Sequence, residues 1–156
     1  MKKRAAFVGQ AMDRASFDDV SLKQASFRDV SLAGARFDDV DASKAELRNA
    51  KLDDASLDDA SAKRLEVHNT SFQAASFDDV DFRGARFANA TFEGARFSDV
   101  SLAGVTISDA NIDGLTIDGV DVAALVAAQR SQKRTAEKGA AKRAVAKRAT
   151  KRKAPR

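Results

Sequence analysis

The chain has 156 residues, enough for one domain, and 44% of them are apolar, yet it contains no Cys, Trp or Tyr. The lack of Cys excludes disulfide bonds, thiol chemistry and a metal site built from Cys ligands. The net charge of +4 combines two opposite parts, because residues 126–156 carry +11 and residues 1–125 carry −7, so we expect an acidic body with a basic tail.

Residues 1–4, Met-Lys-Lys-Arg, form a short basic lead that looks like the start of a signal peptide. The apolar run that follows them is too short for one, since it ends at Gly9 and is soon followed by Asp13 and Arg14. No stretch approaches the roughly 18 apolar residues that a membrane-spanning helix needs. We therefore expect a soluble, cytoplasmic protein.

From residue 5 onwards the chain repeats every five residues. All 24 positions from Phe7 to Val122 whose numbers end in 2 or 7 are apolar, and they include all ten Phe. Positions ending in 0 or 5 are Ala, Val or Leu, except Gln10 and Thr70. A five-residue period fits neither an α-helix nor a β-strand. We therefore expect small repeats that stack into a solenoid.

Units such as residues 15–19 (ASFDD), 25–29 (ASFRD) and 85–89 (ARFAN) resemble the pentapeptide-repeat family, whose pattern is A(D/N)LXX. The resemblance covers residues 5–124. It implies an all-β fold, a right-handed quadrilateral β-helix of about six coils with four pentads per coil, in which the large residue and the small one two positions earlier point inward. The chain departs from the pattern by placing Ser, Arg or Asp before the large residue. Six coils at the usual spacing of about 4.8 Å would make a rod of roughly 29 Å.

In a coil of four pentads, residues twenty apart stack on one another. One inner column then contains Phe17, Phe37, Leu57, Phe77, Phe97 and Ile117. The next contains Leu22, Ala42, Ala62, Phe82, Leu102 and Val122, beside a small-residue column of Val20, Val40, Ala60, Val80, Val100 and Val120. The coils around Ala42 and Ala62 have the smallest core residues, and Leu65 can fill part of the gap. Local repacking there is one alternative, and a shallow pocket or bend is the other.

The register changes after Gly114. Asp121 can cap a helix in which Val122, Leu125 and Val126 lie at i, i+3 and i+4. A solenoid needs its open end covered, because an exposed coil offers unpaired backbone groups to other chains. We predict that residues 121–130 form this capping helix. The resemblance implies that the C-terminal element also forms a dimer in relatives that bind gyrase, so both a monomer and a homodimer remain alternatives here.

Residues 131–156 consist mainly of Ala, Lys and Arg. Like charges repel and Gly139 interrupts the segment, so we predict a largely disordered tail. Its composition resembles the basic tails of linker histones and bacterial nucleoid proteins. Nucleic acid, an anionic membrane surface and a purely solubilising role are three alternatives, and the lack of aromatic residues argues against base stacking. The predicted nucleic-acid-binding residues are Lys133, Arg134, Lys138, Lys142, Arg143, Lys147, Arg148, Lys151, Arg152 and Lys153.

Residues suited to catalysis are scarce. The one His, His68, lies at an outward position of the repeat, and there is no Gly-rich phosphate loop. The repeated Asp-Asp pairs are regular surface features, not a pocket in which one carboxyl has a raised pKa. We therefore expect no enzyme activity, cofactor, metal site or small-molecule substrate.

Stacking by twenty gathers Asp on one edge of the rod, which we call the acidic edge. It contains Asp18, Asp19, Asp38, Asp39, Asp58, Asp59, Asp78, Asp79, Asp99 and Asp118. The adjacent edge is basic and contains Lys3, Arg4, Lys23, Lys44, Lys63, Arg64 and Arg83. Asp suits turns because its side chain bonds to nearby backbone, but turn chemistry does not explain why charge is sorted by edge. The sorting indicates either a binding partner or mutual compensation between the two edges.

The resemblance offers a function for the acidic edge. Some pentapeptide-repeat proteins, those that confer quinolone resistance, mimic B-form DNA and bind the DNA-binding saddle of the topoisomerase DNA gyrase. Rows of Asp would present negative charge to a surface built for phosphates, although those relatives commonly carry projecting loops that this chain lacks. The leading hypothesis is a non-enzymatic DNA mimic that modulates or protects gyrase and is held near the nucleoid by its tail. The alternative is a scaffold or assembly protein whose rod binds another protein and whose tail binds nucleic acid or an anionic surface.

Overall fold

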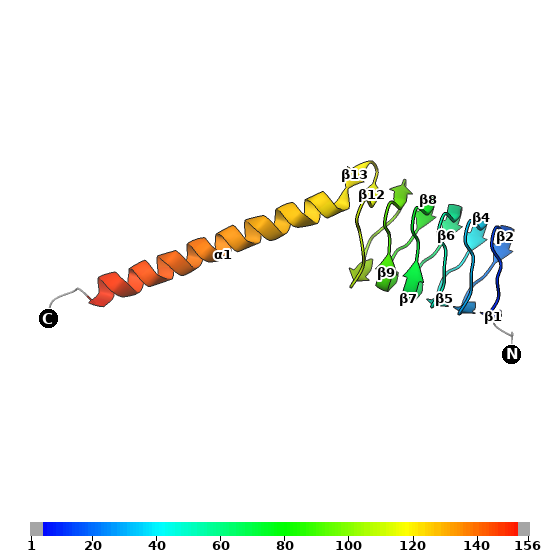
Figure 1. Ribbon diagram of the computed structural model, residues 1–156, viewed down its shortest axis with the longest axis horizontal. Helices are drawn as coiled ribbons and strands as arrows, with labels where there is room; N and C mark the ends of the chain where they lie inside the picture. Colours follow the sequence, from blue (N-terminus) through cyan, green and yellow to red (C-terminus); the bar gives the residue numbers. More distant parts are fainter. Residues whose placement is uncertain (1–4, 153–156) are drawn as a thin grey trace. The chain divides into compact units, whose positions relative to one another are not determined.

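The computed structural model describes residues 5–152, with side chains up to residue 145 (Figure 1). The chain divides into two compact units, one ending at Val122 and the other beginning at Ala123. In the first unit, one sheet contains β1 (Ala6–Val8), β3 (Ser26–Arg28), β5 (Glu46–Arg48), β7 (Glu66–Ser71), β9 (Arg86–Thr91) and β11 (Thr106–Ser108). The other sheet contains β2 (Ser16–Ser21), β4 (Arg36–Asp41), β6 (Ser56–Ser61), β8 (Ser76–Asp81), β10 (Arg96–Ser98), β12 (Thr116–Ile117) and β13 (Val120–Asp121).

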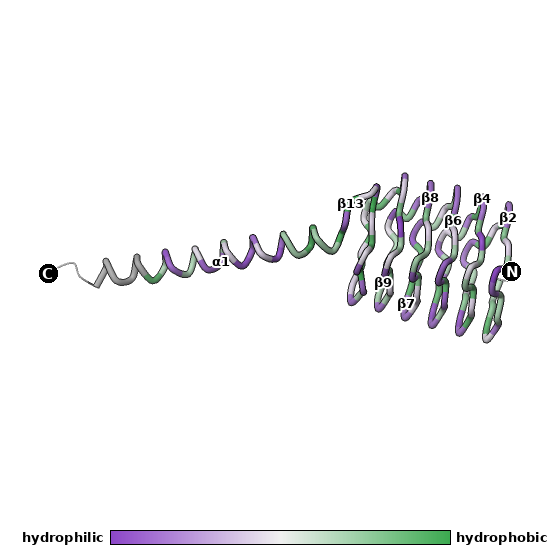
Figure 2. Tube along the Cα trace, turned by 45° about the horizontal axis from the view of Figure 1, so that its top comes forward, coloured by the Kyte–Doolittle hydropathy of each residue, from purple (hydrophilic) through white to green (hydrophobic). Residues whose placement is uncertain are grey.

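From β1 to β12, neighbouring strands in each sheet are parallel, and residues twenty apart pair with one another. Phe17 pairs with Phe37 across β2 and β4, and Phe7 pairs with Phe27 across β1 and β3. Figure 2 shows hydrophobic and hydrophilic segments alternating along every coil, as expected when one residue set faces the core and the other faces solvent. The predicted β-helix of about six coils with a C-terminal helix is therefore confirmed.

Stacked aromatic rings fill the core. The ring centroids of Phe17 and Phe37 are 4.7 Å apart, and those of Phe77 and Phe97 are 4.5 Å apart. Such offset stacking adds a favourable aromatic contact to the apolar area that each ring buries. In the coil with the smallest core residues, Leu65 is buried with 5% of its surface exposed, which favours local repacking there.

Thr70 interrupts the apolar pattern but is buried, with 2% of its surface exposed. Its hydroxyl donates a hydrogen bond to the His68 carbonyl oxygen at 3.0 Å. A buried hydroxyl needs such a partner, because leaving it unpaired would cost stability. A polar residue can therefore occupy this inward position.

The last coil ends differently from our expectation. The five-residue pattern continues to Val122, but the chain reverses at Asp118 and Gly119, whose φ angles are 48° and 77°. Two residues with positive φ form the tight turn that joins antiparallel strands, and β13 accordingly pairs antiparallel with β12. The predicted inward place of Val120 is therefore wrong, since this residue is 49% exposed. Strand β13 thus forms the last strand of its sheet.

A single helix, α1 (Val122–Arg152), follows β13. It begins one residue after the predicted start and continues well beyond Arg130, so the prediction that residues 131–152 lack regular structure is wrong. Ala, Lys and Arg are all good helix formers, and the cost of one Gly, Gly139, is about 1 kcal/mol. Among the described residues, no helix is long and apolar enough to span a membrane. Lys153 lies outside the described part of the chain.

Candidate functional site

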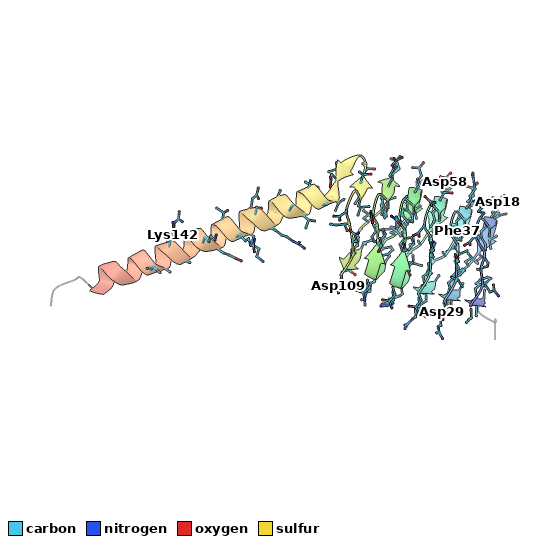
Figure 3. All side chains as sticks on the ribbon, viewed as in Figure 1. Asp18, Asp29, Phe37, Asp58, Asp109 and Lys142 are labelled. Carbon is cyan, nitrogen blue, oxygen red and sulfur yellow. The ribbon has the colours of Figure 1, made fainter. Side chains whose placement is uncertain are left out.

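Two corners of each coil require a left-handed backbone conformation at residues whose numbers end in 9. These residues, from Gly9 to Asp109, all have φ between 48° and 61°. Asn and Asp tolerate this conformation better than other residues with side chains. The two corners lie two pentads apart along the coil, and Figure 3 labels Asp29 and Asp109 on the sheet that begins with β1. Residues whose numbers end in 9 therefore supply two such positions in every full coil, and residues whose numbers end in 4 supply two more.

On the sheet that begins with β1, three of the six residues at this corner are Asn: Asn49, Asn69 and Asn89. The Nδ2 of Asn49 donates to Oδ1 of Asp29 at 2.9 Å, and Asn69 and Asn89 each donate to the Asn twenty residues earlier at 3.2 Å. We call this column the amide ladder: Asp29, Asn49, Asn69 and Asn89. It shows that neutral side chains satisfy the corner and also bond from coil to coil.

The other corner carries only Asp. We call this column the Asp row, and it contains Asp19, Asp39, Asp59, Asp79 and Asp99. Within residues 5–145, none of these five carboxylates takes part in a side-chain hydrogen bond or an ion pair. Successive coils lie about 4.8 Å apart, a distance at which like charges repel. Because Asn49, Asn69 and Asn89 meet the same backbone requirement without charge, the negative charge of the Asp row is not needed for the turn.

The second column of the acidic edge lies beside the Asp row. Strand register pairs Asp18 with Asp38, and Asp58 with both Asp38 and Asp78. Figure 3 labels Asp18 and Asp58 in this column. Asp38 forms an ion pair with Arg36, in which Nη2 of Arg36 lies 2.9 Å from Oδ2 of Asp38. Asp118, in the hairpin turn, accepts a hydrogen bond from the Asp99 backbone N–H at 3.1 Å.

The basic edge does not neutralise the acidic edge in the described residues. Lys23 pairs with Asp41 at 2.7 Å, while Lys63 and Arg83 both pair with Asp81, at 3.1 and 2.6 Å. Hydrogen bonds from the Arg83 side chain, above all, hold the pKa of Asp81 well below its usual range. These three cations pair with Asp residues outside the acidic edge, and no ion pair within residues 5–145 joins the two edges. Lys3 and Arg4 lie outside the described residues.

An open groove of about 730 Å³ runs along the Asp row. All five Asp of the row line it, together with Lys23, Asp41, Asp81 and Arg83. The groove is therefore lined both by the carboxylates of the Asp row, which form no ion pair within residues 5–145, and by the paired charges of Lys23, Asp41, Asp81 and Arg83. Such a surface is suited to a cationic partner that spans several coils.

The predicted residues of the C-terminal segment lie on α1 or at its start. Val122 is partly buried against the core, whereas Leu125 is 54% exposed; Val126 is half-buried. The predicted role of these three residues in capping or dimerisation stays a prediction. Five of the predicted tail cations have described side chains, and all are exposed: Lys133, Arg134, Lys138, Lys142 and Arg143. Lys147, Arg148, Lys151 and Arg152 belong to the helix, but their side chains are outside the description.

His68 lies in β7 and is half-buried. In the part of the chain that the structure describes, no group of three or more Asp, Glu or His is arranged to hold a metal ion.

Sequence reasoning missed the bonds that join one coil to the next. The Asp13 carboxylate accepts hydrogen bonds from the Ser31 hydroxyl and, at 3.1 Å, from the Ala33 backbone N–H. Asp53 accepts the corresponding bonds from Ser71 and Gln73. The signal was present in the sequence, since these pairs recur forty residues apart and the Asn of the amide ladder recur every twenty residues.

Two family models match the chain, both described as pentapeptide repeats, one over residues 15–54 and the other over residues 72–121. The chain belongs to the pentapeptide-repeat family. This pentapeptide-repeat protein keeps the register of twenty residues between the two matches as well, through β6 and β7. No curated protein sequence matches it significantly.

Solved structures of other pentapeptide-repeat proteins are similar to this one. Rfr23 from the cyanobacterium Cyanothece 51142 is 14% identical, with a TM-score of 0.41 and coverage of 72% of this chain and 91% of that chain. HetL, involved in heterocyst differentiation regulation, from the cyanobacterium Nostoc sp. strain PCC 7120, is 19% identical, with a TM-score of 0.35 and coverage of 74% of this chain and 63% of that chain. A trypsin-treated form of QnrB1, a plasmid-mediated fluoroquinolone resistance protein, is 14% identical, with a TM-score of 0.30 and coverage of 71% and 72%.

Proposed function

We propose that this protein is a non-enzymatic interaction protein whose acidic edge binds a protein surface that otherwise holds nucleic acid. DNA gyrase is the candidate partner, and the basic C-terminal segment keeps the protein near DNA. The observation that supports this most directly is the Asp row, where charge is present although the fold needs only an Asn-like side chain. Pentapeptide-repeat proteins are typically structural or interaction proteins, which agrees with this role.

The density of charge along the acidic edge is close to that of DNA. Two Asp columns on coils about 4.8 Å apart give one carboxylate per roughly 2.4 Å of the rod, whereas double-stranded DNA carries one charge per about 1.7 Å of helix axis. A protein groove lined with Lys and Arg would therefore meet a similar row of negative charge. The choice of gyrase comes from the resemblance to family members that confer quinolone resistance.

The test measures gyrase supercoiling, and its poisoning by a quinolone, with and without the full-length protein. We expect micromolar protein to change at least one of these activities. The Asp39→Asn, Asp59→Asn, Asp79→Asn variant should lose the effect while remaining folded, because Asn occupies the same backbone position in the amide ladder. No effect of the unmodified protein would refute the gyrase role.

A matched control removes the same number of charges elsewhere. Asp29, Asp54 and Asp109 also have positive φ, at 54°, 58° and 51°, but lie outside the acidic edge. The Asp29→Asn, Asp54→Asn, Asp109→Asn variant should keep the effect on gyrase. Equal losses in the two triple variants would show that total charge matters and the acidic edge does not.

A scaffold or assembly role is the second candidate. The observation in its favour is the regular rod, since the register of twenty residues from β1 to β12 leaves no projecting loop, whereas gyrase-binding relatives commonly have loops. In that case the rod binds a different protein, and the basic segment binds nucleic acid or an anionic surface. Light scattering of the purified protein, combined with pull-downs against gyrase subunits, tests this candidate: a stable complex with gyrase would count against it.

A further inference from the structure

Four cations of α1 occur at intervals of four residues. Arg130, Arg134, Lys138 and Lys142 are all exposed, and Figure 3 labels Lys142 on the helix. Each step of four residues rotates by only about 40° around an α-helix and rises about 6 Å. The four side chains therefore form one stripe, about 18 Å long, which we call the cation stripe.

The cation stripe does not stabilise the helix. Like charges four residues apart repel one another, and within residues 122–145 no ion pair neutralises them. Arg143 lies about 140° from Lys138 and at least about 100° from every other member of the stripe. An anionic partner would relieve this repulsion and thereby favour the helix.

The chemistry of α1 narrows the class of partner. Between residues 127 and 145 Val145 is the only apolar residue larger than Ala, so the helix lacks the broad apolar face with which interfacial helices enter a bilayer. No aromatic residue is present in this range, so the stacking that single-stranded nucleic acids require is absent. The remaining candidate is a nucleic-acid duplex, whose regularly spaced phosphates can be bound by regularly spaced cations alone. Over 18 Å, one DNA strand presents about five phosphates.

We propose that α1 binds double-stranded nucleic acid as a helix, with the cation stripe against the phosphates and without sequence preference. This inference rests on the proposed nucleic-acid role of the C-terminal segment. It adds the kind of nucleic acid and the side of the helix that binds. A disordered tail with the same composition would use all its cations equally, whereas a helix uses one side more than the other.

The test measures binding of the full-length protein to a labelled 20-base-pair DNA duplex of arbitrary sequence at several salt concentrations. Arg134 lies in the cation stripe and Arg143 does not, and the two Arg→Ala variants lose the same charge. Arg134→Ala should weaken binding and make the log–log salt dependence shallower by about 1, while Arg143→Ala should stay within twofold of the unmodified protein. Equal losses would overturn the cation stripe but leave nucleic-acid binding intact. No binding by the unmodified protein at low salt would overturn the nucleic-acid role itself.

A second pair of variants tests the helix without changing charge. A Cβ at Gly139 would meet nothing within 4 Å, so Gly139→Ala should keep or tighten binding, whereas Gly139→Pro breaks the helix and should weaken binding at least tenfold. Equal affinities of these two variants would overturn binding as a helix. Equal or tighter binding to the corresponding single strand, or to phosphatidylserine-containing vesicles, would overturn the choice of a duplex.

Discussion

An inward Phe in the interior of the array packs against the coils before and after it, whereas one in the first coil has only the following coil. Phe97 is 3% exposed, and its ring lies 4.5 to 5.8 Å from those of Phe77, Phe82 and Phe92. Phe17 lies in the first coil, is only partly buried and stacks on Phe37. The same residue type at equivalent positions of the repeat therefore has different packing.

Replacement of Phe97 by Ala should lower the free energy of unfolding by about 3–5 kcal/mol, because it removes a buried ring and leaves a cavity. Phe17→Ala should cost less, since part of that ring is already in contact with solvent. Denaturant unfolding of both variants measures the difference. Equal costs would mean that the end coil is packed as tightly as the interior.

Asp81 illustrates how a charge can support the fold without belonging to the acidic edge. Its carboxylate accepts hydrogen bonds from the Arg83 backbone N–H at 3.1 Å and from the Arg83 guanidinium. Asp81→Asn keeps an oxygen for the backbone bond but removes the charge, and should cost about 0.5–1 kcal/mol at neutral pH.

The pH dependence of this cost follows from the lowered pKa of Asp81. A carboxylate with a lowered pKa in the folded state stabilises fully above its unfolded pKa of about 3.9. The difference between the unmodified protein and Asp81→Asn should therefore be constant from pH 7 to about pH 5 and shrink as the pH falls below about 4. Unfolding free energies across this range provide the measurement, and a pH-independent difference would contradict the assigned role.

At the scale of elements, the hairpin between β12 and β13 decides where the coil stops. Gly119 has φ of 77°, and a Cβ placed there would meet nothing within 4 Å. A side chain at this position is therefore disfavoured by backbone conformation and not by crowding. The sequence does contain the Asp-Gly pair that is typical of such turns, but the five-residue pattern running through it to Val122 obscured the signal.

Gly119→Ala should destabilise the protein by about 1–2 kcal/mol, the cost of left-handed backbone for a residue with a Cβ. Gly119→Asn should cost less, because Asn tolerates this conformation. Thermal or denaturant unfolding of the two variants makes the comparison. If Ala and Asn had equal effects, the turn would not depend on this conformation.

The length of α1 depends on the balance between charge repulsion and helix propensity, which composition alone does not determine. Repulsion among Lys and Arg and the presence of Gly139 favoured disorder, whereas the helix propensity of Ala, Lys and Arg favoured helix. The structure has helix through Arg152. Helix α1 begins at Val122, one residue after the predicted start at Asp121.

For the whole molecule, opposite charges are separated between the two compact units. Removing residues 131–156 leaves the β-helix unit and most of the negative charge. We expect residues 1–130 to keep the proposed effect on gyrase and to lose binding to duplex DNA. The full chain should bind DNA with a log–log salt slope of about −4 if the four cations of the cation stripe contact phosphates. Supercoiling assays and fluorescence anisotropy measure the two properties, and retention of DNA binding by residues 1–130 would contradict the division.

The acidic edge could be predicted from the sequence because a coil of twenty residues makes its columns a matter of counting. The ion pairing of its carboxylates could not be predicted in this way. Only the structure shows that Lys23, Lys63 and Arg83 pair with Asp41 and Asp81, leaving the Asp row without ion pairs within residues 5–145. Such pairing depends on the directions and lengths of side chains on neighbouring coils, which a repeat pattern does not contain.

The sequence by itself determined the five-residue repeat and most of the residues that face the core, because inward apolar side chains recur at a constant spacing. The β-helix with four pentads per coil, and with it the stacking of residues twenty apart, was implied by the resemblance to the pentapeptide-repeat family. The tertiary structure decided where the coil ends, how far α1 extends and which charges are neutralised. These features depend on a turn conformation, on a balance of helix energies and on contacts between coils, and each competes with the regular pattern instead of following from it.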